Sequence, residues 1–330
     1  MHRACTQAGK VNGLTRPADG GRGGLYRLPR GATLSRGRRG ASDGIEGKPR
    51  GGSMQRAHMT ELVWQSLLGL KAGRREGPAP GWTREARAAW ALYAPLMERA
   101  ARRPFLFAQV GQSLDGRIAT LSGDATAISG PDGLRHLHRC RALADAVVVG
   151  VRTALADNPR LSVRLVDGPS PARVVIDPRG RLPDDAALLD GGDGARRVLI
   201  QACDRRRTAG IEVVRLPAVD GWIAPADIHA ALGELGFERV LVEGGGITIA
   251  GFLEAGLLQR LHVAIAPLII GAGPSGLRTT APVARLADAL RPETSVYGLD
   301  SDVVFDCALA AGNAKRSTWP TTQARAVRRA

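Results

Sequence analysis

The chain has 330 residues, a length typical of about two domains, and its 44% apolar and 23% charged residues are ordinary for a globular protein. The net charge of +15 lies mainly at the ends, since residues 1–53 carry +8 and residues 311–330 carry +5, which leaves +2 between them. These ends contain only Tyr26 and Trp319 as aromatic residues on which bases would stack. We therefore expect no nucleic-acid partner, with a DNA-binding role of the basic ends as the alternative.

The four cysteines, Cys5, Cys140, Cys203 and Cys307, are too scattered for a disulfide framework or a paired-cysteine zinc site. No apolar run reaches the roughly 18–20 residues of a membrane span. The basic N-terminus also lacks the apolar segment of a secretory signal. We therefore expect a cytoplasmic protein without a membrane partner, with an organellar transit peptide as the alternative for the arginine-rich start.

Residues 1–53 contain 13 glycines and almost no apolar periodicity, so they cannot bury enough surface to offset the entropy of ordering. We predict a disordered tail there, and Met54 or Met59 is then a candidate for the true start. Residues 311–330 are polar and basic again, and we predict a second disordered tail.

Residues 54–103 are predicted as a helical extension. A first helix begins near Thr60, and a second follows Thr83, a typical N-cap residue. Pro95 should kink the second helix. The apolar residues on one face of this helix are Ala86, Trp90, Tyr93 and Met97. Such a stripe predicts that the extension packs on the body of the protein or on a second subunit.

Residues 104–310 alternate short apolar strands with helices, which is the pattern of one α/β domain with a mainly parallel sheet. The predicted strands are 104–110, 146–150, 173–177, 197–201, 211–215, 239–242, 262–269 and 301–307. The predicted helices are 131–142, 227–235 and 247–255.

One stretch of this domain suits a phosphate. The strand 239–242 is followed by Glu243, three glycines and an alanine-rich helix. Glycines let the backbone approach a ligand, and the start of a helix offers N–H groups to an anion. The stretch therefore favours a dinucleotide site, although it lacks the Gly-x-Gly-x-x-Gly spacing.

Several motifs follow one another along the same domain. They are Ser113–Ala119, Ile128–Pro131, Arg141–Thr153, Ala156–Arg164, Val175–Pro178, Val242–Gly246 and Ala266–Gly271. Together they resemble the reductase domain of bacterial riboflavin biosynthesis, the C-terminal half of the bifunctional pyrimidine deaminase/reductase. The zinc motif of the deaminase half, His-x-Glu followed by Pro-Cys-x-x-Cys, is absent from the sequence. The resemblance, over roughly 104–308, is therefore to a stand-alone reductase.

The resemblance implies a dihydrofolate-reductase-like α/β fold, NADPH as cofactor and a homodimer. It implies that the ribosyl group of 5-amino-6-(5-phosphoribosylamino)uracil is reduced to ribityl, with hydride delivered to the sugar C1′ after ring opening. Two alternatives stay open. One is the same reduction of 2,5-diamino-6-ribosylamino-pyrimidinone 5′-phosphate, and the other is a non-catalytic relative that binds a nucleotide.

The resemblance also assigns roles to single residues. Asp157 would contact cofactor and substrate and is the candidate for proton transfer, with a turn-forming aspartate as the alternative. Arg141 and Arg164 would bind the substrate phosphate, because a guanidinium matches phosphate geometry, unless they are solvated surface residues. The other substrate-binding residues would be Leu161 and Glu243. The cofactor-binding residues would be Thr153, Asp157, Gly245, Gly246, Ile247, Thr248, Ile249, Ala250 and Gly251.

The chain departs from the usual pattern of this family at four positions. Ala125 and Ala127 stand where the family often has serine and tryptophan, which removes an aromatic wall from the nicotinamide site. Pro178 stands in place of serine, and Gln259 in place of aspartate. The candidate replacements for the aromatic wall are the tryptophans of the extension, Trp64, Trp82 and Trp90.

Two pairs of polar residues have simpler interpretations. His136 and His138 are two residues apart in a predicted helix, so their rings diverge; we predict surface side chains and no metal site. Arg179 and Arg181 would either meet the 2′-phosphate of NADPH or remain solvated.

Overall fold

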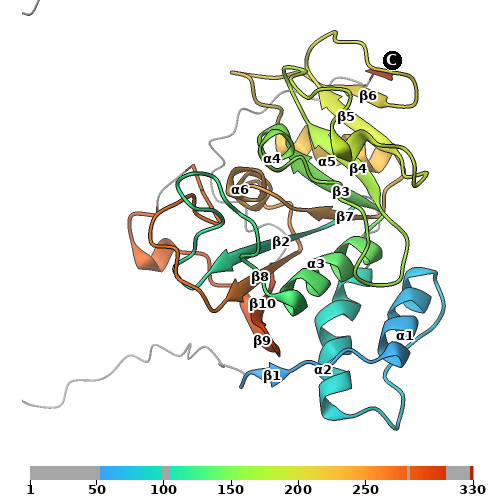
Figure 1. The fold of residues 1–330 in the computed structure, drawn as a ribbon, viewed down its shortest axis with the longest axis vertical. Helices are drawn as coiled ribbons and strands as arrows, with labels where there is room; N and C mark the ends of the chain where they lie inside the picture. The colour runs from blue at the N-terminus through green and yellow to red at the C-terminus, as the bar shows by residue number, and fades with distance from the viewer. Residues whose placement is uncertain (1–52, 99–103, 281–282, 310–327, 330) are drawn as a thin grey trace, which may run out of the picture. The chain divides into compact units, whose positions relative to one another are not determined.

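The structure, a computed structural model, describes residues 53–98, 104–280, 283–309 and 328–329. The tails predicted for residues 1–53 and 311–330 lie almost wholly outside these ranges. The described residues form one eleven-stranded sheet with helices on both faces (Figure 1). No helix among them has the length and apolar character needed to cross a membrane.

The centre of the sheet is parallel. Its strands are β1 (Gln55–Arg56), β2 (Phe105–Ser113), β3 (Ala146–Gly150), β4 (Ala172–Ile176), β5 (Arg197–Gln201), β6 (Glu212–Arg215), β7 (Arg239–Val242), β8 (Arg260–Ala266), β9 (Glu293–Leu299), β10 (Asp302–Ala308) and β11 (Arg328–Arg329). They lie in the order β1-β9-β10-β8-β2-β7-β3-β4-β5-β6-β11. Every neighbouring pair from β8 to β6 is parallel, whereas β10 is antiparallel to β8 and β9.

The central strands are apolar on both faces because helices cover both sides of the sheet. In β3, Val147 and Val149 belong to one hydrophobic core, while Val148 belongs to the other. This alternation follows from the two-residue period of a strand. The run Ala-Val-Val-Val-Gly therefore forms a strand that is buried between two layers.

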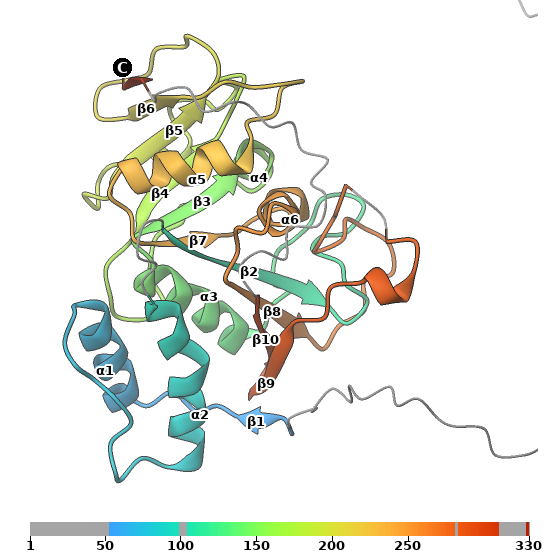
Figure 2. The ribbon, with the colours of Figure 1, turned by 180° about the vertical axis from the view of Figure 1, so that it is seen from behind.

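Four helices form these layers: α3 (Pro131–Leu143), α4 (Val151–Asp157), α5 (Pro225–Glu234) and α6 (Gly246–Glu254). The core residues of α3 and α4, such as Leu143 and Val151, belong to the same core as Val147, and those of α5 and α6, such as Ile228 and Phe252, belong to the same core as Val148. The two views show α4 and α5 on opposite faces of the sheet (Figures 1 and 2). The α/β class predicted from the sequence is confirmed.

The N-terminal extension is helical and packs on the body. It contains α1 (Glu61–Lys71) and α2 (Arg84–Tyr93), which lie beside α3 (Figure 2). Leu67 and Leu92 are fully buried in the core that Leu143 of α3 also enters. The first of the two predicted packing partners is therefore the one observed.

Local signals explain where these helices begin and end. The Thr83 hydroxyl accepts a hydrogen bond from the Ala86 N–H at 3.1 Å, as its N-cap role predicts. The second helix ends at Tyr93 and a 3-10 turn covers Ala94–Met97, so Pro95 ends the helix rather than kinking it. The cause is that proline has no N–H to donate to the preceding turn.

Candidate active site

A cleft of about 670 Å³ opens at the carboxyl ends of β2, β3, β4 and β7. Its lining includes the segments that directly follow three of these strands: Thr153 after β3, Pro178 after β4 and Glu243 after β7. From β3 the chain continues to β4 on one side, whereas from the neighbouring β7 it continues to β8 on the other side, so the connections change direction here. Such a switch point leaves a crevice in which α/β proteins bind ligands. The volume falls within the roughly 300–1,000 Å³ of small-molecule sites.

Arg141 of α3 and Glu243 form a two-point ion pair in the cleft. Arg141 Nε and Nη2 donate to the two carboxylate oxygens at 2.9 and 2.7 Å, and both side chains are buried. Burial lowers the pKa of Arg141, but the charge and hydrogen bonds of Glu243 raise it more, so the net shift is upward. Arg141 Nη1 also donates to the Ser162 carbonyl at 3.4 Å. The pair thus joins α3, the end of β7 and the loop after α4.

Two of the three glycines at the start of α6 are required by close packing. Gly244 has φ +96°, the left-handed region that favours glycine, and a Cβ there would lie 2.9 Å from Thr153 Oγ1. A Cβ on Gly246 would lie 2.6 Å from the carbonyl oxygens of Ser275 and Gly276. The glycine run is therefore explained in part by the protein's own backbone.

The middle glycine borders the cleft. The Gly245 N–H donates to Thr153 Oγ1 at 2.8 Å, and a Cβ at this position would lie only 3.3 Å from the same oxygen. The N–H groups left for an anion are those of Gly246 and Ile247, which open α6 and precede any acceptor within the helix. The turn can therefore receive a phosphate, but with fewer amides than three glycines suggest.

Asp157 and Leu161 lie on opposite sides of a tight turn at the edge of the cleft. Asp157 is the last residue of α4, and Asn158, with φ 39°, caps the helix in the left-handed conformation. Partial burial of the carboxyl group raises the pKa of Asp157, although the residue as a whole is exposed. Leu161 also has positive φ, at 55°, and is buried. A leucine in this conformation is rare, which marks the turn as constrained.

Most residues assigned from the resemblance meet in this cleft. Those that line it are Arg141, Thr153, Asp157, Leu161, Glu243, Gly245, Gly246, Ile247, Thr248 and Gly251. Ile249 and Ala250 are fully buried within α6 and do not line it. Arg164 is exposed outside the lining, and its Nη1 donates to Ser162 Oγ at 3.2 Å.

The tryptophans of the extension do not replace the missing aromatic wall. Ala125 and Ala127 line the cleft, as the family pattern predicts for those positions. Trp64 is buried in the core, and its indole N–H donates to a backbone carbonyl of the body at 2.9 Å. Trp82 and Trp90 pack against that core with ring centroids 5.6 Å apart. None of these three lines the cleft, so that expectation was wrong.

Trp222, which the sequence interpretation did not single out, lines the cleft instead. Val219 and Trp222 exchange two backbone hydrogen bonds of 2.9 Å across Asp220 and Gly221. Both central residues have positive φ, 52° and 79°, which defines a type I′ turn. The Arg152 guanidinium lies 5.7 Å from the centre of the indole. The Asp-Gly pair is the sequence signal that points to this turn.

The rim of the cleft is basic. Arg152, Arg179, Arg181 and Arg278 all line it and are all exposed. The carboxylates in the lining, besides the paired Glu243, are Asp157 and Asp220. Exposed guanidinium groups around a crevice favour an anionic ligand.

The two histidines of α3 are buried, so the prediction of surface side chains was wrong. His136 and His138 are 0% and 3% exposed. His136 lies against Tyr93 of the extension and His262 of β8, which the spacing within one helix does not reveal. His138 Nδ1 accepts a hydrogen bond from the Arg164 N–H at 3.0 Å. Burial, with smaller effects of Arg141 and Arg164, lowers the pKa of His138 to about 4. Burial also lowers the pKa of His136 well below its ordinary value.

The fold and cleft define an α/β protein with a crevice at the switch point of its mainly parallel sheet. The chain belongs to the RibD C-terminal domain family, whose family model matches residues 104–296. The 2,5-diamino-6-ribosylamino-4(3H)-pyrimidinone 5′-phosphate reductase of Methanothermobacter thermautotrophicus is 34% identical over 214 residues, which cover 62% of this chain and 97% of that protein. The riboflavin biosynthesis protein RibD of Actinobacillus pleuropneumoniae is 32% identical over 176 residues, which cover 52% of this chain and 47% of that one.

Solved structures confirm the dihydrofolate-reductase-like fold predicted from the sequence. The deaminase/reductase of Thermotoga maritima aligns with a TM-score of 0.54 at 24% identity, covering 68% of this chain and 62% of that one. The riboflavin biosynthesis reductase Rib7 of Saccharomyces cerevisiae aligns with a TM-score of 0.54 at 21% identity, covering 76% of this chain and all of that one. At these identities the likeness is one of fold.

Proposed function

We propose that this protein is an oxidoreductase of riboflavin biosynthesis that uses NADPH to reduce the ribosyl group of a phosphoribosylamino-pyrimidine to ribityl. Family membership supports the reductase class. The observation that carries the proposal is that residues assigned separately to substrate and to cofactor line one cleft at the switch point of the sheet.

The cleft suits a dinucleotide phosphate. The amides of Gly246 and Ile247 at the start of α6 would receive the pyrophosphate, with Thr248 beside them. Trp222 offers a flat apolar face for the adenine ring, and Arg179 and Arg181 offer cations for the 2′-phosphate. When bound there, NADPH supplies the hydride for the reduction.

The protein's own residues supply position and a proton. The ion pair with Arg141 holds the Glu243 carboxylate in the lining of the cleft, where it can accept from a pyrimidine N–H or a sugar hydroxyl. Asp157 is the candidate for proton transfer to the nitrogen of the ring-opened C1′=N group as C1′ takes up hydride. The raised pKa of its carboxyl group fits that role. The substrate phosphate would lie toward the basic rim, at Arg278 or at Arg164 beyond it.

Two pyrimidines are candidates for the substrate. The diamino-pyrimidinone is favoured because both archaeal relatives matched over most of their length, 97% and 83%, carry that substrate in their names. The aminouracil is the substrate that the resemblance to the bifunctional enzyme implies, but the chain spans only about half of those relatives. A homodimer and a cytoplasmic location complete the proposal.

The test uses the purified full-length protein with NADPH and each pyrimidine in turn. NADPH oxidation is followed by absorbance, and the product is checked by mass for a gain of two hydrogens. Turnover of either pyrimidine establishes the reductase and identifies the substrate. NADPH binding without turnover of either would point to a non-catalytic relative, and failure to bind NADPH would overturn the proposal.

A further inference from the structure

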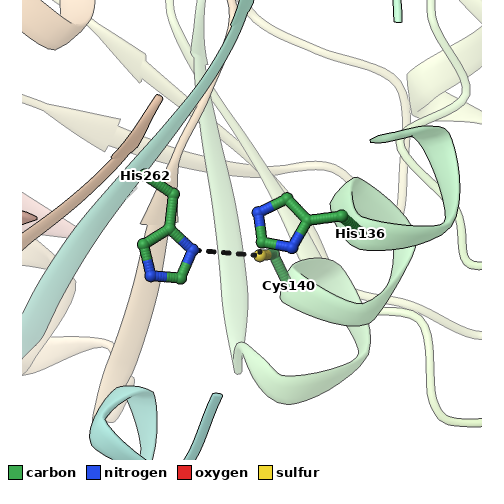
Figure 3. A group of neighbouring side chains, drawn as sticks. All are labelled: His136, Cys140 and His262. Atoms are coloured by element: carbon green, nitrogen blue, oxygen red, sulfur yellow. Dashed lines mark hydrogen bonds between the residues drawn. The ribbon is translucent and has the colours of Figure 1, made fainter. Parts of the chain in front are cut away.

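Three side chains that can bind a metal meet in the core, away from the cleft. His136 and Cys140 lie one turn apart on α3, and His262 approaches them from β8 (Figure 3). Cys140 Sγ is 3.8 Å from His136 Nε2 and 4.0 Å from His262 Nδ1, and these ligand atoms all lie within 4.8 Å of one another. All three residues are completely buried.

The far side of each imidazole is held by a further polar group. His262 Nε2 lies 3.2 Å from Asp306 Oδ1, at hydrogen-bond distance though outside good hydrogen-bond geometry. Because a carboxylate can only accept, the proton of this ring belongs on Nε2 and the lone pair on Nδ1, which faces Cys140. Asp306 is itself fixed by Arg260, whose Nε and Nη2 lie 2.9 and 2.6 Å from its two oxygens.

The second ring has an equivalent partner. His136 Nδ1 lies 2.8 Å from Tyr93 Oη of the extension, which leaves Nε2 to face Cys140. Histidines that bind metals characteristically donate their other N–H to a carboxylate or another acceptor, and this contact fixes the ring and its tautomer. Both rings of the cluster therefore have a polar partner on one nitrogen and place the other nitrogen within 4.0 Å of the Cys140 sulfur, and the rings stack with centroids 5.2 Å apart.

The tautomer of His136 decides whether hydrogen bonds alone can satisfy these three groups. With the proton on His136 Nδ1, both ring lone pairs are directed inward, the single S–H of Cys140 can satisfy only one of them, and an unpaired polar atom in a dry core is costly. Metal–sulfur and metal–nitrogen bonds of about 2.3 and 2.0–2.1 Å separate sulfur from nitrogen by roughly 3.6–3.8 Å. The observed separations are close to that spacing.

We propose that His136, Cys140 and His262 bind one thiophilic d10 cation, copper(I) or zinc(II), in the core between α3 and β8. One thiolate and two imidazoles form a soft donor set of the kind that selects these ions. Binding replaces the thiol proton, which is released to solvent, by the metal.

Charge and ligand number favour copper(I) of the two. Copper(I), one thiolate and two neutral imidazoles sum to zero charge, which suits a site with no exposed surface. Zinc(II) would leave a positive charge, and the nearby Asp306 is already paired with Arg260. Structural zinc also takes four protein ligands, whereas the described residues place three in this cluster.

The consequence of the site is structural. Cys140 precedes Arg141 in α3, so a metal on the cysteine would fix, from the core side, the helix that presents Arg141 to the cleft. Tyr93 of the extension, β8 and α3 would be joined at one point. The metal is not placed in the reduction itself, because the cluster does not line the cleft.

The first test measures the metal in full-length protein purified without oxygen from cells grown with added copper or added zinc. We expect about one equivalent per chain, and X-ray absorption with one sulfur and two nitrogen neighbours. Copper in this environment supports both the site and the charge argument. Zinc in the same environment supports the site and contradicts the charge argument for copper(I). Protein that is folded yet holds neither metal would overturn the proposal.

Variants separate this site from adventitious binding. Cys140→Ser and His262→Gln should each lose the bound metal, whereas Cys307→Ala, a buried cysteine outside the cluster, should keep it. If a variant fails to fold, nitrogen NMR of the imidazole groups in the wild-type protein still tests the proposal, because it shows which ring nitrogen carries the proton. A proton on His136 Nε2 would show a simple chain of hydrogen bonds from Tyr93 to His262 and contradict the proposal. These readouts do not depend on reductase activity.

Discussion

The Thr153 hydroxyl accepts the Gly245 N–H at 2.8 Å and so joins the first turn of α4 to the glycine turn before α6. These segments follow neighbouring strands, β3 and β7, which are about 90 residues apart in the chain. The threonine therefore holds the two walls of the cleft at a fixed distance. The Gly245 N–H that it binds is no longer available to a phosphate.

Replacing Thr153 by valine should loosen that turn with little change in volume. A net hydrogen bond of about 1 kcal/mol corresponds to roughly fivefold weaker NADPH binding, measured by fluorescence titration. Thr153→Ser should restore most of the affinity, because it keeps the acceptor oxygen. Equal affinity in the wild type and the valine variant would show that the contact does not position the cofactor.

The Arg141–Glu243 pair should be needed more for the reaction than for the fold. Arg141→Met or Glu243→Met alone leaves an unpaired buried charge and should cost about 3–5 kcal/mol of unfolding free energy in urea. The double variant should recover most of that stability, since both charges are gone, yet remain inactive. An active double variant would contradict the proposed role of the Glu243 carboxylate.

Trp222 should be the aromatic residue that NADPH contacts. Trp222→Ala should weaken NADPH binding by roughly tenfold, in line with about 1–3 kcal/mol for a stacked base, and Trp222→Phe should weaken it less. Trp82→Phe in the extension is the matched control and should leave the affinity unchanged, because that ring packs on the core. Isothermal titration with NADPH and with an adenosine bisphosphate separates adenine contacts from nicotinamide contacts.

Stability should fall as the pH falls from about 6.5 toward 4 because of His138. The folded pKa of about 4 is below the ordinary 6.5, so between these values the unfolded chain binds a proton that the folded chain does not. This difference removes about 2 kcal/mol of unfolding free energy at pH 5 relative to pH 7.5. His138→Gln should show a correspondingly smaller loss in urea titrations at the two pH values. The effect of His136 has the same sign and is common to both proteins, so an unchanged loss would contradict this assignment.

The parallel sheet was predictable because its strands are continuous apolar runs, such as 146–150 and 197–201, separated by helical segments. Among the α-helices and the strands longer than two residues, two were not predicted. The α4 helix has only seven residues after a glycine, too short to show a helical period, and the buried side chains of β9 are few among polar ones. The predicted strand 262–269 is shifted from the observed β8, since the apolar run continues past the last hydrogen-bonded residue.

The cleft was predictable only through motifs that lie directly after strands, as with Thr153, Asp157 and Glu243. Trp222 was not predicted because the Asp-Gly pair before it indicates only a turn, whereas its proximity to α4 depends on the order of the sheet. The cluster around Cys140 escaped because His262 is more than a hundred residues away in the chain. Within α3 the spacing places His136 and Cys140 one turn apart, but two residues on one helix do not by themselves indicate a metal site, and His138 turns to a different neighbour.

The sheet has another property that follows from its order. Its two outermost strands, β1 and β11, come from opposite ends of the described chain and are only two residues long. Long open strands invite pairing with other molecules, and very short edge strands discourage it. Shortened versions of the protein that begin after residue 60, or that end before residue 328, would uncover the edges of β9 and β6 and should aggregate more readily than the full chain.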